Sequence, residues 1–192
     1  MGELSYFCPR ASLDIKNRKM KKIVLIYWPK KGNVEKTAHW IYEQFDESII
    51  DIVTITSIEI EKLSQYENII IGGSTTGADN WGDTHKSRWI EFFEKLEKVD
   101  LTGKKVAFFG LGDQILYPEH FVDGMELLKT EFSKYDVGFV GTWPTDGYEH
   151  TGSDSIEGDK FIGLALDEDQ QSELTAERIK TWAAQLKEEF GL

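Results

Sequence analysis

The sequence predicts an α/β fold, a three-layer sandwich in which helices cover both faces of a five-stranded parallel sheet. Three observations predict it. Strand-like runs alternate with segments of helical spacing along the chain. The strand-like runs are continuously apolar, as in strands that are buried on both faces of a parallel sheet. The length of 192 residues suits one domain with a substantial core.

The first half of the chain is expected to supply three strands and three helices. The expected strands cover 22–28, 49–55 and 68–71, and each is rich in apolar or β-branched residues. The expected helices cover 34–45, 58–63 and 85–96. The face of the last helix that is expected to turn inward carries Trp89, Ile90, Phe93 and Leu96.

The second half begins with an apolar run from Val106 and then places a helix over 118–134, starting at Pro118. A fifth strand is expected over 137–142. A polar insertion at 143–160 interrupts that strand, which resumes over 161–166. The final amphipathic helix, 174–190, has Leu174, Ile179, Trp182, Leu186 and Phe190 at helical spacing.

Charge and cysteine content exclude several classes of function. The chain has 34 acidic and 22 basic residues, a net charge of -12, which disfavours nucleic acid and anionic lipid as partners. The single cysteine, Cys8, excludes an internal disulfide and a thiolate cluster. No apolar run approaches the length of a membrane span, and we expect a cytoplasmic protein. Residues 1–19 lack periodicity and the apolar core of a secretory signal, which predicts a disordered leader before a domain at 20–192; a mis-assigned start, with Met20 as the natural one, is the alternative.

Two loops at the expected carboxyl edge of the sheet carry unusual residues. The apolar run from Val106 breaks at Gly110 and Gly112, and Tyr117 follows. Glycines there allow backbone to approach a ligand, and an aromatic plate suits a planar heterocycle; an ordinary strand-to-helix turn is the alternative. The loop after the first strand, 29–33, leads into a helix, where amides can hold a phosphate. It matches neither the Walker loop nor the dinucleotide fingerprint, and a solvated basic turn is its alternative.

Three segments together resemble the long-chain flavodoxin family. They are 101–114, which contains Phe109-Gly110-Leu111-Gly112-Asp113-Gln114, then Trp143-Pro144-Thr145-Asp146-Gly147-Tyr148, and 161–179. The resemblance implies a flavodoxin-like fold with strand order 2-1-3-4-5 and a fifth strand interrupted by an insertion. It also implies a non-covalently bound FMN and low-potential single-electron transfer between protein partners, rather than enzymatic turnover.

The resemblance implies a phosphate-binding loop, and here the sequence departs from the family. The family pattern T-x-T-G-x-T is replaced by Pro29, Lys30, Lys31, Gly32, Asn33 and Val34, so only the glycine remains. Backbone amides can still hold a phosphate, and a lysine ammonium can replace the lost hydroxyls as a point charge. FMN binding that weakens with salt is therefore expected.

The resemblance also assigns residues around the flavin ring. In the loop after the third strand, Trp81 is the candidate inner plate, and Gly82, Thr75 and Thr76 accompany it; an aromatic that only covers the loop is the alternative for Trp81. Tyr117 matches the outer stacking tyrosine. The remaining candidates are Leu111, Gly112 and Asp113 at the pyrimidine edge, His120 near the ring, and Asp146 near the ribityl chain. Trp89 is expected in the core, and His39, His85 and His150 at the surface.

Partners and alternative functions follow from the same resemblance. We expect acidic side chains to ring the exposed flavin edge and to steer basic-faced redox proteins, both reductase-type donors and flavodoxin-dependent acceptors, onto a monomer. These acids are Asp79, Asp83, Asp113, Glu119, Asp123 and Glu149. A flavin-dependent NAD(P)H or quinone reductase is one alternative function, and an FMN-free binding module is another.

Overall fold

A parallel sheet forms the centre of the molecule in a computed structural model that describes residues 22–74 and 87–192. Six strands belong to this sheet, in the order β2-β1-β3-β4-β5 with β9 also paired to β4, and all their pairings are parallel. The expected fold class and strand order are therefore confirmed. The strands are β1 (Ile23–Trp28), β2 (Ile50–Thr54), β3 (Asn68–Gly73), β4 (Lys105–Leu111), β5 (Gly138–Val140) and β9 (Leu164–Leu166).

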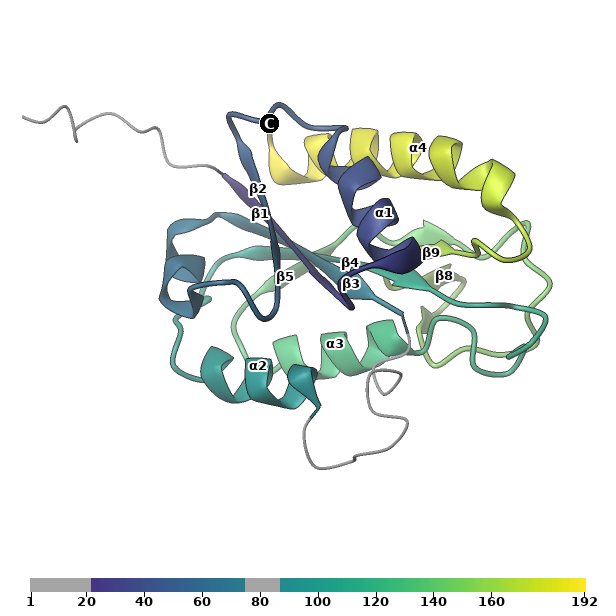
Figure 1. Cartoon of the computed structure of the whole chain (residues 1–192), viewed down its shortest axis with the longest axis horizontal. Coiled ribbons are helices and arrows are strands. Elements are labelled where there is room, and N and C mark those ends of the chain that lie inside the picture. The colour runs from purple at the N-terminus through teal and green to yellow at the C-terminus, as the bar shows by residue number, and fades with distance from the viewer. Residues whose placement is uncertain (1–21, 75–86) are drawn as a thin grey trace, which may run out of the picture.

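Helices cover both faces of the sheet (Figure 1). Helices α1 (Gly32–Tyr42) and α4 (Ser172–Phe190) lie on one face, and α2 (Arg88–Leu96) and α3 (Gly124–Phe132) lie on the other. A short 3-10 helix, η1 (Ile60–Gln65), precedes β3. None of the helices in the described ranges is long and apolar enough to cross a membrane.

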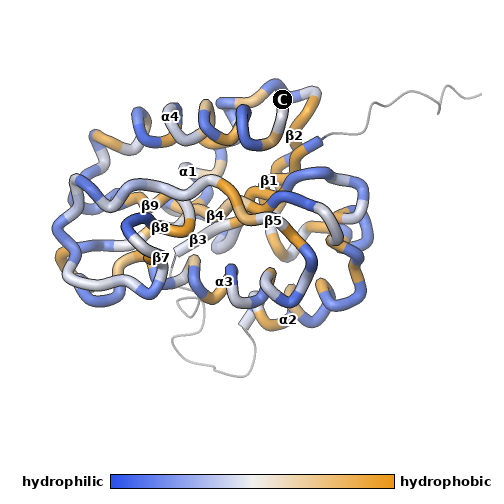
Figure 2. Tube along the Cα trace, turned by 180° about the vertical axis from the view of Figure 1, so that it is seen from behind, coloured by the Kyte–Doolittle hydropathy of each residue, from blue (hydrophilic) through white to orange (hydrophobic). Residues whose placement is uncertain are grey.

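Two apolar cores lie between the layers, one on each face of the sheet. Along β1, Val24 and Ile26 belong to the core under α2 and α3, whereas Ile23 and Leu25 belong to the core under α1 and α4. Because side chains alternate between the faces of a strand, a strand that is buried on both faces must be apolar throughout. In Figure 2 the central strands are largely hydrophobic, whereas the helices on either side alternate between hydrophobic and hydrophilic residues.

The interrupted fifth strand is confirmed. β5 pairs with Lys105–Ala107 of β4, and β9 pairs with Phe109–Leu111 of the same strand. The intervening insertion carries a small antiparallel sheet of β6 (Trp143–Pro144), β8 (Lys160–Phe161) and β7 (Ile156–Glu157). Gly163 lets the chain return to β4, because a Cβ there would lie 2.3 Å from the Phe108 carbonyl oxygen.

The structure corrects two helix predictions. The helix expected to start at Pro118 begins at Gly124, because the segment before it forms turns. Asp113 stabilises the first of these turns, where its Oδ1 accepts hydrogen bonds from the Ile115 and Leu116 amides, both at 2.9 Å. In α2, Ile90 was expected to turn inward but is 53% exposed. Phe92 is buried instead. Trp89 lies in the core as expected.

Helix α4 follows its expected pattern except at its first apolar residue. Ile179, Trp182, Leu186 and Phe190 are buried, but Leu174 is 39% exposed. Trp182 is the largest fully buried side chain among the described residues, and its Nε1 donates a 2.7 Å hydrogen bond to the Gly141 carbonyl oxygen. This bond joins α4 to the chain just before the insertion.

Replacing this indole tests how firmly α4 holds the insertion. Trp182→Phe leaves the Gly141 carbonyl without its donor and opens a gap, so we expect the free energy of unfolding in urea to fall by about 2–4 kcal/mol. Trp40→Phe, at a half-buried position on α1, is the control and should change it by less than about 1 kcal/mol. Equal effects of the two substitutions would contradict the role assigned to Trp182.

Candidate functional site

The main cavity lies at the carboxyl edge of the sheet, where β1, β3, β4 and β9 end. Its volume is about 790 Å³, within the range of small-molecule and cofactor sites. Parallel strands end at one edge, and ligands of open α/β sheets bind there. The lining comprises Pro29, Lys31, Gly32, Asn33, Val34, Ser74, Leu111, Gly112, Asp113, Leu116, Tyr117, His120, Val122, Asp123, Gly124, Glu168 and Asp169.

One end of the cavity is the amino-terminal end of helix α1. Gly32, Asn33 and Val34 occupy the first helical positions, where backbone N–H groups have no acceptor within the helix. The Lys31 N–H is already used, because it donates to Glu35 Oε2 at 3.1 Å. Lys31 and Gly32 have φ values of 82° and 72°. The three amides and the positive end of the helix dipole make this end suitable for an anion.

A glycine at position 32 is explained by backbone conformation rather than by crowding. A Cβ built on Gly32 meets no atom within 4 Å, but the φ of 72° lies in the left-handed region that other residues rarely adopt. Gly110 and Gly112 differ from it, because a Cβ would contact Met125 Cγ at 2.8 Å in one case and the Val122 N at 3.0 Å in the other. These two glycines allow β4 to pack against α3 and the segment that leads into it.

The β4 loop contributes one long wall of the cavity. The Gly112 N–H, expected to serve a ligand, donates to the Leu166 carbonyl oxygen at 3.1 Å. Gly112 therefore lines the cavity with its backbone surface while its amide hydrogen bond belongs to the sheet. Tyr117 is 51% exposed and lines the same cavity, so its ring is available as a plate.

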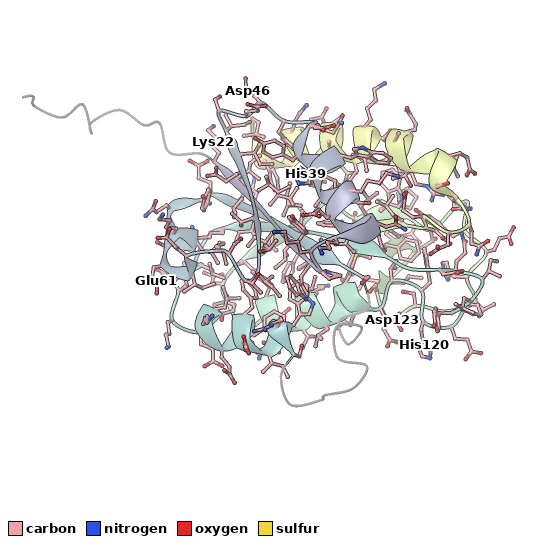
Figure 3. All side chains as sticks on the ribbon, viewed as in Figure 1. Lys22, His39, Asp46, Glu61, His120 and Asp123 are labelled. Atoms are coloured by element: carbon pink, nitrogen blue, oxygen red, sulfur yellow. The ribbon has the colours of Figure 1, made fainter. Side chains whose placement is uncertain are left out.

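Four carboxylates belong to the lining of the cavity. Asp113, Asp123, Glu168 and Asp169 line it, and the pKa of Asp113 is lowered mainly by its hydrogen bond from the Leu116 amide. His120 Nδ1 lies 2.9 Å from Asp123 Oδ2, and both residues are labelled in Figure 3. Glu168 lies between Lys36 Nζ, at 3.4 Å, and the Thr175 hydroxyl, which donates to its Oε1.

A buried carboxylate that the sequence did not reveal holds two loops of the site together. Asp167 is fully buried, and its Oδ2 accepts the Gln114 N–H at 3.0 Å. Its Oδ1 accepts the Asp169 and Gln170 N–H groups at 3.0 and 2.9 Å. Gln114 is buried in turn, and its Oε1 accepts the Glu149 N–H of the insertion. An Asp after an apolar strand is the only sequence signal for this arrangement.

Some predicted site residues lie away from the cavity. Lys30 and Asp146 are exposed and do not belong to the lining. Thr75, Thr76, Trp81 and Gly82 fall outside the described residues, as do Asp79, Asp83 and His85. Conversely, Ser74, Leu116, Val122, Asp123, Gly124, Glu168 and Asp169 line the cavity although the sequence did not single them out as cofactor contacts.

Comparison with known proteins identifies the family. The family model for flavodoxin matches residues 25–182. A flavodoxin from Nostoc sp. is 42% identical over 172 residues, which covers 90% of this chain and 99% of that protein. The chain belongs to the flavodoxin family. Flavodoxin 1 of Escherichia coli is 38% identical over 162 residues, covering 84% of this chain and 90% of that protein.

Solved structures agree with this assignment. The crystal structure of Fusobacterium nucleatum flavodoxin bound to flavin mononucleotide is 31% identical, with a TM-score of 0.77 over 89% of this chain and 99% of that one. The oxidised flavodoxin 2 of Bacillus cereus, 23% identical with a TM-score of 0.60, shares the fold.

Two of the histidines expected at the surface of this flavodoxin lie among the described residues. His39 is exposed as expected, but His150 is partly buried among aromatic rings. Its ring stacks on Phe121 with centroids 5.6 Å apart, and Phe161 lies 5.3 Å away. Its buried Nδ1 has no hydrogen-bond partner among the described residues. Burial therefore lowers the pKa of His150 from 6.5.

This pKa shift predicts how stability depends on pH. The folded state favours neutral His150, so its contribution is fully present above the ordinary value of 6.5 and is lost as the pH falls below it. Removing the titration with His150→Phe should flatten the fall in unfolding free energy of the apoprotein between about pH 7 and pH 5. The exposed His39→Gln serves as the control and should keep the parental slope. Parallel curves for parent and His150→Phe would contradict the assignment.

Proposed function

We propose that this flavodoxin is a low-potential single-electron carrier that binds one FMN non-covalently in the cavity at the carboxyl edge of the sheet. The observation that carries the proposal is the shape of that cavity. Helix-start amides that have no acceptor within α1 lie at one end, and the exposed ring of Tyr117 lies along the wall. The bound flavin supplies the one-electron chemistry, and the residues of the chain bind and orient it.

The α1 end of the cavity is the proposed phosphate site. The N–H groups of Gly32, Asn33 and Val34 donate to the phosphate, and the positive end of the helix dipole adds to their effect. Lys31, which lines the cavity, supplies a compensating charge in place of the hydroxyls of the family loop. Pro29 closes the loop beside it. Lys30 is exposed and outside the lining, so we assign it only a long-range charge effect.

The loop after β4 is the proposed binding site of the flavin ring. Tyr117 stacks on its outer side, and Leu111, Gly112 and Asp113 form the wall at its pyrimidine edge. His120, hydrogen-bonded to Asp123, lies at the rim. Trp81 remains the proposed inner plate, together with Gly82, Thr75 and Thr76 of the same loop. We leave Asp146 out of the contact set because its side chain is exposed and away from the lining.

The partners that we propose are basic-faced redox proteins. The lining of the cavity includes acidic residues, and the exposed Ile115, Leu116 and Tyr117 offer an apolar centre for docking. An apolar centre within a charged rim is the usual anatomy of an interface. The chain acts as a monomer in the cytoplasm, and residues 20–192 form its FMN-binding domain.

The visible spectrum and flavin titrations test the proposed cofactor. Purified protein should show a flavin spectrum, and its apoprotein should bind FMN with an affinity that falls as salt rises, since Lys31 contributes a partly screened charge. Lys31→Gln should weaken FMN binding about tenfold and flatten the salt dependence. The protein alone should not oxidise NAD(P)H, which distinguishes a carrier from a reductase.

Lys30→Gln provides a matched control with the same change of charge and composition. Because Lys30 is outside the cavity lining, this variant should change FMN affinity less than about threefold. Equal effects of the two lysine substitutions would show that net charge, not the placement of Lys31, determines binding. A colourless protein that takes up no FMN would overturn the cofactor proposal and favour the binding module.

The acids expected around the flavin edge include Glu119 and Glu149, which the structure places outside the cavity lining, and their charge predicts electrostatic steering of the partner. Glu119→Gln combined with Glu149→Gln should lower the association rate with a basic reductase several-fold at low salt, and the difference should vanish at high salt. Both residues are exposed, and the Thr151 amide joins their segments by donating to the Pro118 carbonyl oxygen at 2.7 Å. The control pair is Glu47→Gln with Glu61→Gln. Glu61 lies at the opposite end of the molecule from His120 (Figure 3). Rates independent of salt would contradict steering.

A further inference from the structure

The loop between β1 and α1 is braced by a carboxylate that lies outside the cavity lining. We propose that Glu35 is a positioning residue for the phosphate site, holding the Lys31 backbone so that the three following amides remain directed at the cavity. The inference rests on the proposed function, because it concerns how FMN is held. It adds a residue that makes no contact with the cofactor itself.

The geometry places Glu35 across the base of the loop. Its Oε2 accepts the Lys31 N–H at 3.1 Å, and its Oε1 accepts the Tyr27 hydroxyl at 2.7 Å. Tyr27 lies near the end of β1, with its ring in the core under α1 and α4. The carboxylate therefore connects the end of a buried strand to the beginning of the helix, and the residues between them form a closed turn.

The backbone of this turn needs such support. Lys31 has a φ of 82° and a ψ of 164°, a positive-φ conformation that is unfavourable by about 1–3 kcal/mol for a residue with a Cβ. It occupies the N-cap of α1 but makes no side-chain cap hydrogen bond. In a capping box a glutamate at N3 accepts the N–H of the N-cap residue, and Glu35 makes the corresponding contact from N4. Glu35 thus supplies a cap interaction in a loop that has lost its threonines.

The charge of Glu35 acts against the position that it holds. A carboxylate next to a phosphate site repels the phosphate, so a purely electrostatic view predicts tighter FMN binding when Glu35 is neutralised. The carboxylate stays ionised, because the pKa of Glu35 is lowered, mainly by the hydrogen bond from Tyr27 and further by Lys31 and Lys30. Positioning by Glu35 therefore strengthens FMN binding, whereas repulsion by its charge weakens it. Substitutions that remove only one of the two effects can separate them.

The decisive experiment compares Glu35→Ala with Glu35→Gln, using FMN and riboflavin as probes. Riboflavin has the ring but no phosphate, so the ratio of the two affinities reports on the phosphate site alone. Glu35→Ala removes the brace, and we expect FMN affinity to fall about tenfold while riboflavin affinity changes less than about twofold. In Glu35→Gln the side chain can still accept the Lys31 N–H and contact Tyr27. Its FMN affinity should therefore equal or exceed that of the parent.

A second measurement needs no flavin. Burial and the bond to Glu35 together raise the pKa of Tyr27 to about 12. In apoprotein carrying Glu35→Ala, the phenolate absorbance should appear at lower pH, but still above 10, because burial is the larger cause. Glu43→Ala, an exposed glutamate at the other end of α1, is the matched control and should change neither the affinity ratio nor this titration.

The outcomes separate the inference from the proposed function. Parent protein that binds FMN, with Glu35→Ala unchanged or tighter, would overturn the inference and leave the proposed function standing. An equal loss of FMN and riboflavin would also overturn it, since that would indicate a general structural effect. Parent protein that binds neither probe would overturn both.

Discussion

Parallel strand pairing is the constraint on which the site depends. Strands β1, β3, β4 and β9 run in the same direction, so their carboxyl ends meet at one edge and bring loops from distant parts of the sequence together. The pairing is possible because both faces of each strand are covered, which in turn requires continuously apolar strands. The cavity is therefore a consequence of the sheet, and the loops determine only its chemistry.

The loops contribute different chemical groups to the cavity. The α1 loop offers amides and one lysine, whereas the β4 loop offers an aromatic ring and a glycine-lined wall. Neither loop is held by its own residues alone. Glu35 and Tyr27 brace the first, and Asp167 braces the second through the Gln114 amide. Carboxylates that brace the loops thus orient a site whose proposed ligand, FMN, is itself an anion.

Several features of the site were predictable from the sequence and others were not. Gly32, Tyr117 and the glycine pair of β4 stand out because unusual residues at strand ends are a local signal. Glu168 and Asp169 have no such signal, and they reach the cavity because the turn after β9 folds toward it. His150 was expected at the surface, and only the packing of the insertion on Phe121 buries it. The start of α3 was misplaced for a related reason, since Asp113 stabilises turns where Pro118 suggested a helix.

By itself the sequence determined the fold class, the strand order through family resemblance, the split fifth strand and the strand ends where ligands bind. These properties depend on hydrophobic periodicity and on local motifs, which are written along the chain. The tertiary structure alone decided which lysine lines the cavity, which glycines serve packing, and which carboxylates brace the loops. Those outcomes depend on contacts between residues far apart in sequence, such as Gln114 with Asp167, and no local pattern encodes them.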